Sequence, residues 1–206
     1  RPLKLPPVES SKIPDIVHYE ARQNIPFALA DVEWRANVLP HDEEEGYALE
    51  TEVVLTAVKR DQLQRTLKPF ICNEIFPDLV ELQPLALMNY LWCTKLGHRP
   101  IGSYVLAIEA GASTTTLLIT NGARVWMRSI PIGGFHFTKQ LSREFKLTSK
   151  KAEQLKRDAM HADDPKALFM TLRPIFQDFL SEIQRSVGFF LANNRGAEIK
   201  EVIFLG

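Results

Sequence analysis

The sequence lacks the features that would assign it directly to several large protein classes. It has only two cysteines in 206 residues, Cys72 and Cys93, which form no C-x-x-C pair and have no histidine cluster beside them. This arrangement argues against a metal site or a disulfide scaffold and fits a reducing cytoplasm. No apolar run approaches the roughly 20 residues of a membrane helix, and no charged-then-apolar leader opens the sequence. We therefore expect any membrane association to come through a partner.

An excess of charge of either sign is also absent. Lysine plus arginine and aspartate plus glutamate are equal at 25 each, so the chain has no global basic field that would draw it to nucleic acid. With 45% hydrophobic residues, its length allows either one large domain or two smaller ones with a buried core. The composition indicates a soluble globular protein and identifies no partner.

Common catalytic motifs are missing as well. The sequence has no G-x-x-x-x-G-K-[ST] phosphate loop, no G-x-G-x-x-G fingerprint and no G-x-S-x-G nucleophile turn. Its five histidines are scattered and show no H-E-x-x-H spacing. A functional prediction therefore depends on less familiar patterns.

The first 82 residues predict a compact α+β unit. Alternating apolar and polar residues indicate strands, and apolar residues three or four apart indicate helices. The predicted order is an edge strand at the start, a helix from Ile13 to about Asn24, strands at 32–39 and 50–59, a helix at 60–72 and a short strand at 77–82. An acidic turn, "PHDEEEG", separates the two central strands. A further helix follows at 83–97, with a proline near its start and Gly97 at its end.

The rest of the sequence, from about residue 100, begins with a predicted β-meander at 103–134. Three apolar runs supply its strands, and the Asn121-Gly122 pair between the last two is a strong hairpin signal. A helical region follows at 135–195 and includes one long helix from Pro174 to about Asn194, with an apolar stripe along one side. A strand at 199–205 closes the sequence.

The turn of the first hairpin, "EAGASTTT" at 109–116, has the composition of a phosphate-binding turn. Small residues let backbone N–H groups approach phosphate oxygens, and hydroxyl groups donate without bulk. Glu109 could hold Mg²⁺ through water or orient an attacking water. Taken alone, the turn is also compatible with a solvated hairpin tip. The residues of the turn that supply this chemistry are Gly111, Ala112, Ser113, Thr114 and Thr115, and Gly133 and Gly134 form a second small turn that could approach the same ligand.

The helix "KKAEQLKR" offers a second candidate. Glu153 and Lys156 are three residues apart and so share one face. The carboxylate could accept hydrogen bonds from ribose hydroxyls while the lysine stem lies along an adenine ring. An ordinary surface helix with one ion pair has the same spacing, so this alternative stays open.

These motifs occur in an order that resembles the PilM family of type IV pilus assembly proteins. The resemblance runs through "KIPDIVHYEARQNIPF", "DVEW", "VVLTAVKRDQL", "LQPLALMNYL", "EAGASTTTLLITNG", "SIPIGG", "AEQLKR" and "EVIFLG", and so covers nearly the whole sequence. The Q-x-I-P-F and I-P-I-G-G stretches are rather specific to the family, whereas A-E-x-x-K is shared across actin-like ATPases.

The resemblance implies an α/β (α+β) fold of the actin/Hsp70, ribonuclease H-like type. Residues 1–82 correspond to a small inserted α+β subdomain shared with the cell-division protein FtsA, and residues 83–99 to a helix returning to the first lobe. Residues 100–206 correspond to the second lobe, which contains the meander, an outer helical subdomain at 135–195 and the returning strand.

The same resemblance implies an ATP site with Mg²⁺. The family's hairpin usually begins D-I-G, whereas here it begins with Glu109, Ala110 and Gly111. The extra methylene moves the carboxylate, and a displacement of about 1 Å can cost ~100-fold in catalysis, so we expect weak or no ATP hydrolysis. The positions matched to the nucleotide are Gly111, Ala112, Ser113 and Thr114 on the second phosphate hairpin, Gly133 and Gly134 facing the nucleotide, and Glu153 and Lys156 on the adenosine-contacting helix.

Two further features indicate an internal fragment of such a protein. Actin-like proteins hold phosphates between two hairpins, yet no glycine precedes Gly46. The family also continues beyond the position of Gly206 into glycines that flank adenosine. We therefore expect this chain by itself to bind nucleotide weakly or not at all and to be catalytically inactive.

The implied function is that of a cytoplasmic scaffold, peripheral on the inner membrane, in the type IV pilus assembly platform. Its expected partners are the N-terminal peptide of a PilN-like membrane protein, other platform proteins and, as a homo-oligomer, further copies of itself. No nucleic acid and no membrane span of its own are expected. The peptide would occupy a groove beside the inserted subdomain, and candidate contacts are exposed apolar residues of the helix at 13–24 and of "QPLALMNYL". Alternatives are a catalytically active actin-like ATPase or phosphotransferase, an FtsA-like division protein and the cytoplasmic domain of a type II secretion protein.

Overall fold

The computed structural model describes residues 2–39, 43–44, 47–48, 51–96, 102–122 and 124–206. Most of the acidic turn predicted around residues 40–46, and the helix end predicted at Gly97, lie outside them. The predicted boundaries at residues 82 and 99 stay predictions. The chain divides into two compact units: residues up to 102 with 120–126, and residues 103–119 with 127–206.

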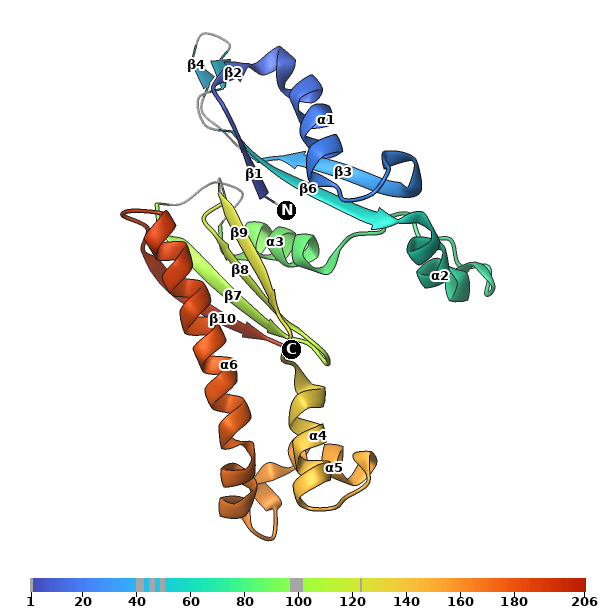
Figure 1. Cartoon of the computed structure of the whole chain (residues 1–206), viewed down its shortest axis with the longest axis vertical. Helices are drawn as coiled ribbons and strands as arrows, with labels where there is room; N and C mark the ends of the chain where they lie inside the picture. The colour runs from blue at the N-terminus through green and yellow to red at the C-terminus, as the bar shows by residue number, and fades with distance from the viewer. Residues whose placement is uncertain (1, 40–42, 45–46, 49–50, 97–101, 123) are drawn as a thin grey trace. The chain divides into compact units, whose positions relative to one another are not determined.

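The first unit contains two small sheets and three α-helices in its described part (Figure 1). The larger sheet has the order β1-β6-β3 with both pairs antiparallel, and the smaller has the order β2-β5-β4. The elements are β1 (Pro2–Leu5), β2 (Val8–Glu9), α1 (Ile13–Asn24), β3 (Val32–Val38), β4 (Glu43–Glu44), β5 (Tyr47–Ala48), β6 (Thr51–Lys59), α2 (Arg60–Ile71) and α3 (Gln83–Thr94), with 3-10 turns at Ser10–Lys12 and Leu29–Asp31.

Helix α1 packs on the larger sheet. Ile13, Val17 and Ala21 recur every four residues, so they lie on one face of the helix, and all three are buried. They meet Val32 and Val53 of the sheet in the core of this unit. The structure confirms the predicted helix and, to within one residue at each end, strands β3 and β6.

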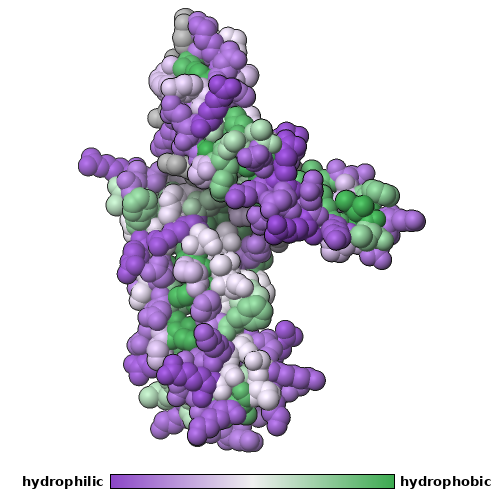
Figure 2. All heavy atoms as spheres, turned by 45° about the vertical axis from the view of Figure 1, so that its right-hand side comes forward, coloured by the Kyte–Doolittle hydropathy of each residue, from purple (hydrophilic) through white to green (hydrophobic). Residues whose placement is uncertain are grey.

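The strand predicted at 77–82 is wrong. In the part of the chain that the structure describes, these residues form neither strand nor helix, and neither sheet of the first unit includes them. An extended apolar segment becomes a strand only where a neighbour satisfies its backbone groups. Figure 2 shows apolar atoms gathered over this part of the surface. Large apolar side chains of α2 and the following segment are exposed: Phe70, Ile71, Ile75, Phe76, Leu79, Val80 and Leu82.

The second unit is a four-stranded sheet with helices. Its strand order is β10-β7-β8-β9, and β10 runs parallel to β7. The structure thus confirms the predicted meander strands and the returning strand. Among the described residues, no helix combines the length and the apolar character needed to cross a membrane. The elements are β7 (Tyr104–Ala110), β8 (Thr115–Thr120), β9 (Val125–Ile130), α4 (Gly134–Glu144), α5 (Ser149–Arg157), α6 (Pro165–Asn193) and β10 (Ile199–Leu205), with a 3-10 turn at Ala159–His161.

The long helix α6 connects the sheet to the helical part of this unit. Near its C-terminus, Phe190 packs edge-on against Tyr104 of β7, with ring centroids 5.0 Å apart. In its middle, Glu182 accepts a hydrogen bond from the Arg128 guanidinium of β9 at 3.0 Å. Near its N-terminus, α6 joins α4 and α5 in a small buried cluster formed by Leu141, Ala152, Leu168 and Leu172.

The start predicted for this helix, at Pro174, is wrong. Helix α6 begins at Pro165, and Pro174 lies in its interior. Asp164 caps the helix by accepting the Ala167 N–H at 2.9 Å, which satisfies one of the unpaired groups at a helix start. A proline inside a helix costs about 3 kcal/mol. Buried Leu168 and Leu172, which precede Pro174, offset that cost by packing.

We expect Leu172→Ala to destabilise the second unit by about 2–5 kcal/mol, because it removes a leucine that is 6% exposed and leaves a cavity. Leu180→Ala on the same helix is the matched control, since Leu180 is 54% exposed and surface changes stay within about 0.5 kcal/mol. Urea unfolding of both variants measures the difference. Equal losses of unfolding free energy in the two variants would show that the buried cluster contributes little to stability.

Candidate functional site

The turn between β7 and β8 lies against the N-terminus of α4. Gly134 N–H donates to the Gly111 carbonyl oxygen at 3.0 Å, and Phe135 N–H donates to that of Ala112 at 2.7 Å. N–H groups in the first turn of a helix have no partner within the helix. The hairpin turn therefore caps α4 with its own backbone.

Gly133, the residue before α4, makes this approach possible. A Cβ atom at this position would lie 2.6 Å from the Gly111 oxygen, 2.6 Å from the Ser113 carbonyl carbon and 2.7 Å from the Thr114 nitrogen. All three are backbone atoms, which cannot move aside as a flexible side chain can. The Gly133 φ of −150° is ordinary extended backbone, so the requirement for glycine here is steric.

Thr138 connects this contact to α5. Its buried hydroxyl lies 3.1 Å from the Gly134 carbonyl oxygen and 2.6 Å from Glu153 Oε2. Lys156 Nζ donates to Thr138 Oγ1 at 3.0 Å, to the Gly134 oxygen at 3.2 Å and to Glu153 Oε2 at 2.7 Å. An ammonium has three N–H donors. All three are used within the protein, which leaves the methylene stem as the part of Lys156 that can contact a ligand.

Glu153 is held as a carboxylate. Hydrogen bonds from Lys156, from the Thr138 hydroxyl and from Arg157 lower the pKa of Glu153 from 4.5 to about 2. The Arg157 bond runs from Nε to Glu153 Oε1 at 2.9 Å. Each of the three donors favours the ionised form. The side chain of Glu153 is 31% exposed, so it also faces solvent and can accept from hydroxyl groups of a ligand.

Eight of the nine predicted site residues form one connected group within the second unit. The turn contacts Gly133 and Gly134 directly, and Gly134 links it to Lys156 and Glu153. In the turn, Ala112, Ser113 and Thr114 are exposed. Their roles toward a ligand stay predictions.

The ninth predicted residue is Glu109, which precedes the turn along the chain. It lies near the end of β7, opposite Leu205 of β10, and is half-buried. The strand carries it toward the turn two residues later.

Two threonines position this group: Thr138, which the sequence-based prediction lacks, and Thr115, which it included only as a hydroxyl of the phosphate-binding turn. Thr138 is four residues after Gly134 and therefore on the same helix face, a spacing that would have identified it. Thr115 donates from its hydroxyl to the Ile132 carbonyl oxygen at 2.8 Å and so ties the start of β8 to the segment before α4. No pattern along the chain indicates this second contact, because its partners are 17 residues apart.

Comparison with solved structures identifies the class of protein. The PilM-PilN type IV pilus biogenesis complex matches with a TM-score of 0.79 and 22% sequence identity, covering 99% of this chain and 58% of that chain. The chain is thus a mixed α/β protein of the actin-like fold class. It spans less than two thirds of the length of that relative.

Two further structures match more weakly. MreB 5 of Spiroplasma citri bound to AMPPNP has a TM-score of 0.48 at 14% identity, over 69% of this chain and 52% of that chain. The ethanolamine utilization protein EutJ from Carboxydothermus hydrogenoformans has a TM-score of 0.40 at 16% identity, over 50% of this chain and 36% of that chain.

Comparison of the sequence with protein families is more specific. Residues 9–206 match the family described as Type IV pilus assembly protein PilM. The match covers almost the entire chain, and the chain belongs to this family.

Glu153→Gln tests the charge cluster, because it removes the charge and keeps the shape. The folded-state pKa near 2 lies below the ordinary value of 4.5, so the ionised contacts stabilise the fold above about pH 4.5 and are lost as the pH falls toward 2. We expect the variant to be less stable than wild type at pH 7 and the difference to shrink between pH 4.5 and 2 in urea unfolding. Glu144→Gln, an exposed change on α4, is the control. The same pH dependence in wild type and Glu153→Gln would contradict this interpretation.

Gly133→Ala tests the contact between the turn and α4. We expect the free energy of unfolding to fall by about 1–3 kcal/mol, because the added methyl group overlaps backbone atoms and forces the turn away. Faster amide hydrogen exchange at Gly134 and Phe135 should accompany it. Gly188→Ala, in an open interior position of α6, should instead stabilise the protein by about 0.5–1 kcal/mol. If Gly133→Ala is as well tolerated as Gly188→Ala, the close contact has no structural role.

Proposed function

We propose that the chain is the nucleotide- and partner-binding part of an actin-like scaffold in the inner-membrane platform of type IV pilus assembly. Membership of the PilM family supports the pilus assignment. The observation that carries the nucleotide assignment is the group formed by the hairpin turn, the start of α4 and the Glu153–Lys156 pair of α5. It combines exposed small residues, a fixed carboxylate and a lysine stem in one place.

The residues of this group fit the parts of ATP. The exposed turn residues Ala112, Ser113 and Thr114 offer backbone N–H groups and hydroxyls without bulk, as phosphate oxygens require. Glu153 stays ionised down to about pH 2 and can accept hydrogen bonds from ribose hydroxyls. The Lys156 stem offers an apolar surface for the adenine ring. The first two N–H groups of α4 already bind the turn, so the phosphate contacts fall to the turn itself.

Glu109 is the candidate for Mg²⁺ and for orienting water. Among the described residues, no group of three or more histidine, cysteine, aspartate or glutamate side chains could hold a metal ion. Mg²⁺ commonly takes one or two carboxylates together with phosphate oxygens and waters, so a single carboxylate is sufficient for it. The Glu109 side chain is one methylene longer than the aspartate that usually begins this hairpin in the family. This difference supports binding of ATP with slow or no hydrolysis.

The proposed partner is the N-terminal peptide of a PilN-like membrane protein. The PilM-PilN complex among the solved structures supports such a partner. Of the predicted peptide contacts, α1 exposes Tyr19 and α3 exposes Tyr90, whereas Leu85 and Leu91 of α3 are buried. Peripheral attachment to the inner membrane from the cytoplasm, contacts with other platform proteins and self-association complete the proposal.

Titration with a fluorescent ATP analogue and Mg²⁺, followed by a pull-down with the PilN-like N-terminal peptide, tests this function. We expect weak nucleotide binding that Lys156→Ala weakens further, by at least tenfold, because the variant loses both the stem and the partner of Glu153. Lys150→Ala, an exposed lysine of the same helix, should bind like wild type. The peptide should be retained, with an amount that changes when ATP and Mg²⁺ are present.

Three outcomes contradict parts of this proposal. Equal nucleotide affinity in Lys156→Ala and Lys150→Ala would remove the α5 site. No peptide retention in either condition, with the protein folded, would remove the partner. Rapid Mg²⁺-dependent ATP turnover that is lost in Glu109→Ala would replace the scaffold with an active ATPase.

A further inference from the structure

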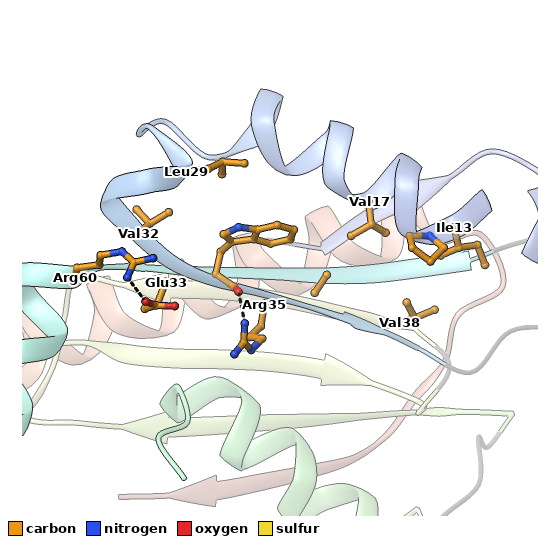
Figure 3. Close-up of a pocket in the computed structure, with 11 residues that line it drawn as sticks. Ile13, Val17, Leu29, Val32, Glu33, Arg35, Val38 and Arg60 are labelled. Carbon is orange, nitrogen blue, oxygen red and sulfur yellow. Dashed lines mark hydrogen bonds and ion pairs between the residues drawn. The ribbon is translucent and has the colours of Figure 1, made fainter. Parts of the chain in front are cut away.

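A groove in the first unit lies between α1 and β3 (Figure 3). Its volume is about 520 Å³, which is in the range of ligand-binding pockets. Apolar side chains from both elements line it, among them Val17 of α1 and Trp34 of β3. The centroids of the Trp34 ring and the His18 ring of α1 are 5.7 Å apart, so this ring contact holds the tryptophan at the groove.

The groove extends around the edge of a strand. Strand β3 is the last strand of the sheet order β1-β6-β3 in the described part of the chain. Alternate residues of a strand point to opposite faces. The lining nevertheless includes Val32 and Val38 from one face and Glu33 and Arg35 from the other. In Figure 3, Val17 and Arg35 lie on opposite sides of the β3 ribbon. A ligand that contacts both sets must run along the strand edge.

The backbone of β3 is available at this edge. The Arg35 carbonyl oxygen accepts a hydrogen bond from the Thr56 hydroxyl of β6 at 3.2 Å, so it faces the sheet interior. The Trp34 carbonyl oxygen accepts instead from the Arg35 guanidinium Nη1 at 3.3 Å. An exposed, flexible side chain thus occupies the place where a neighbouring strand would donate. Because N–H and C=O groups of alternate residues face alternate sides, Ala36 presents its backbone outward as Trp34 does.

The charges at the groove favour an acidic ligand. Arg60 is already bound, to Glu33 Oε1 at 2.6 Å and to the Ala30 carbonyl oxygen at 3.0 Å. Arg35 is exposed, and it forms no ion pair with a carboxylate anywhere in the described residues. A guanidinium binds carboxylates with paired N–H donors. The groove therefore carries one positive charge that a ligand carboxylate can complement.

We propose that this groove binds an extended, acidic segment of a partner protein. The segment adds to β3 as a further strand, places an apolar side chain against Trp34 and sets a carboxylate on Arg35. Main-chain hydrogen bonds supply affinity in this mode, and pockets for alternate side chains supply specificity. The site uses the edge of β3, which has no part in the proposed nucleotide or PilN-like peptide contacts, so it goes beyond the proposed function.

Three synthetic octapeptides serve as probes, each with a fluorescein label and blocked ends. The first alternates valine with glutamate, the second replaces every glutamate by lysine, and the third is the first with methyl groups on alternate backbone nitrogens. Fluorescence anisotropy with the protein measures binding. We expect the acidic peptide to bind at least tenfold more tightly than the lysine peptide. The methylated peptide should not bind, because it cannot pair with the strand edge.

Charge exchange in the protein gives the sharper test. Arg35→Glu should weaken binding of the acidic peptide about tenfold and strengthen binding of the lysine peptide, because it reverses the charge at the groove. Trp34→Ala should weaken both, through loss of the apolar contact. Arg22→Glu, an exposed change on α1 outside the groove, is the matched control and should retain the preference of wild type. Circular dichroism confirms that each variant is folded.

Several outcomes overturn the proposal. They are no binding of the acidic peptide to wild type, equal binding of the acidic and lysine peptides, binding of the methylated peptide, and an unchanged preference in Arg35→Glu. Self-association in sedimentation that Arg35→Glu abolishes would assign the groove to a second copy of the chain. Displacement of the acidic peptide by the PilN-like N-terminal peptide would assign it to the partner already proposed. These last two results reject a separate acidic partner.

Discussion

The candidate site depends on one close backbone contact, between Gly133 and the turn at residues 111–114. Without a side chain at this position, the turn comes near enough for its carbonyl oxygens to cap α4. Capping fixes the direction of the first helical turn, and this fixes Thr138 four residues later. Through Thr138, the contact also fixes Glu153 and Lys156 of α5. The absence of one methyl group thus sets the relative positions of three elements.

The ion cluster on α5 is better understood as a positioning device than as a source of stability. Exposed ion pairs contribute little, with a median of about 0–1 kcal/mol, because solvent screens them and ordering two long side chains costs entropy. Glu153 and Lys156 are 31% and 24% exposed, so screening applies to both. The cluster instead fixes the orientations of the Lys156 and Glu153 side chains. With every ammonium proton of Lys156 bound, the lysine stem has one orientation, and the Glu153 carboxylate has three donors that hold its plane.

The sequence predicted those elements whose pattern is local. Buried positions every four residues defined α1, and alternation defined β3 and β6. The wrong predictions concern features that depend on contacts between residues far apart in the sequence. Whether 77–82 forms a strand depends on a neighbour elsewhere, and the proline at 174 is tolerated because burial outweighs its cost. The site shows the same division: composition and family resemblance indicated the turn and the glycine pair, whereas the steric reason for Gly133 requires the folded backbone.

The groove on β3 shows why an alternating pattern cannot reveal the use of a strand. Apolar residues at every second position predict a half-buried strand, whether the edge of that strand is paired with a neighbour or open. Open edges invite aggregation, and proteins commonly protect them with charged side chains. Arg35 provides such protection, because its guanidinium covers the Trp34 carbonyl oxygen and adds a positive charge beside it. The same charge makes the edge selective: a neutral or basic segment meets an uncompensated guanidinium, whereas an acidic segment neutralises it and can replace its hydrogen bond. For this reason, the same arginine that excludes most strands from this edge can also recognise an acidic one.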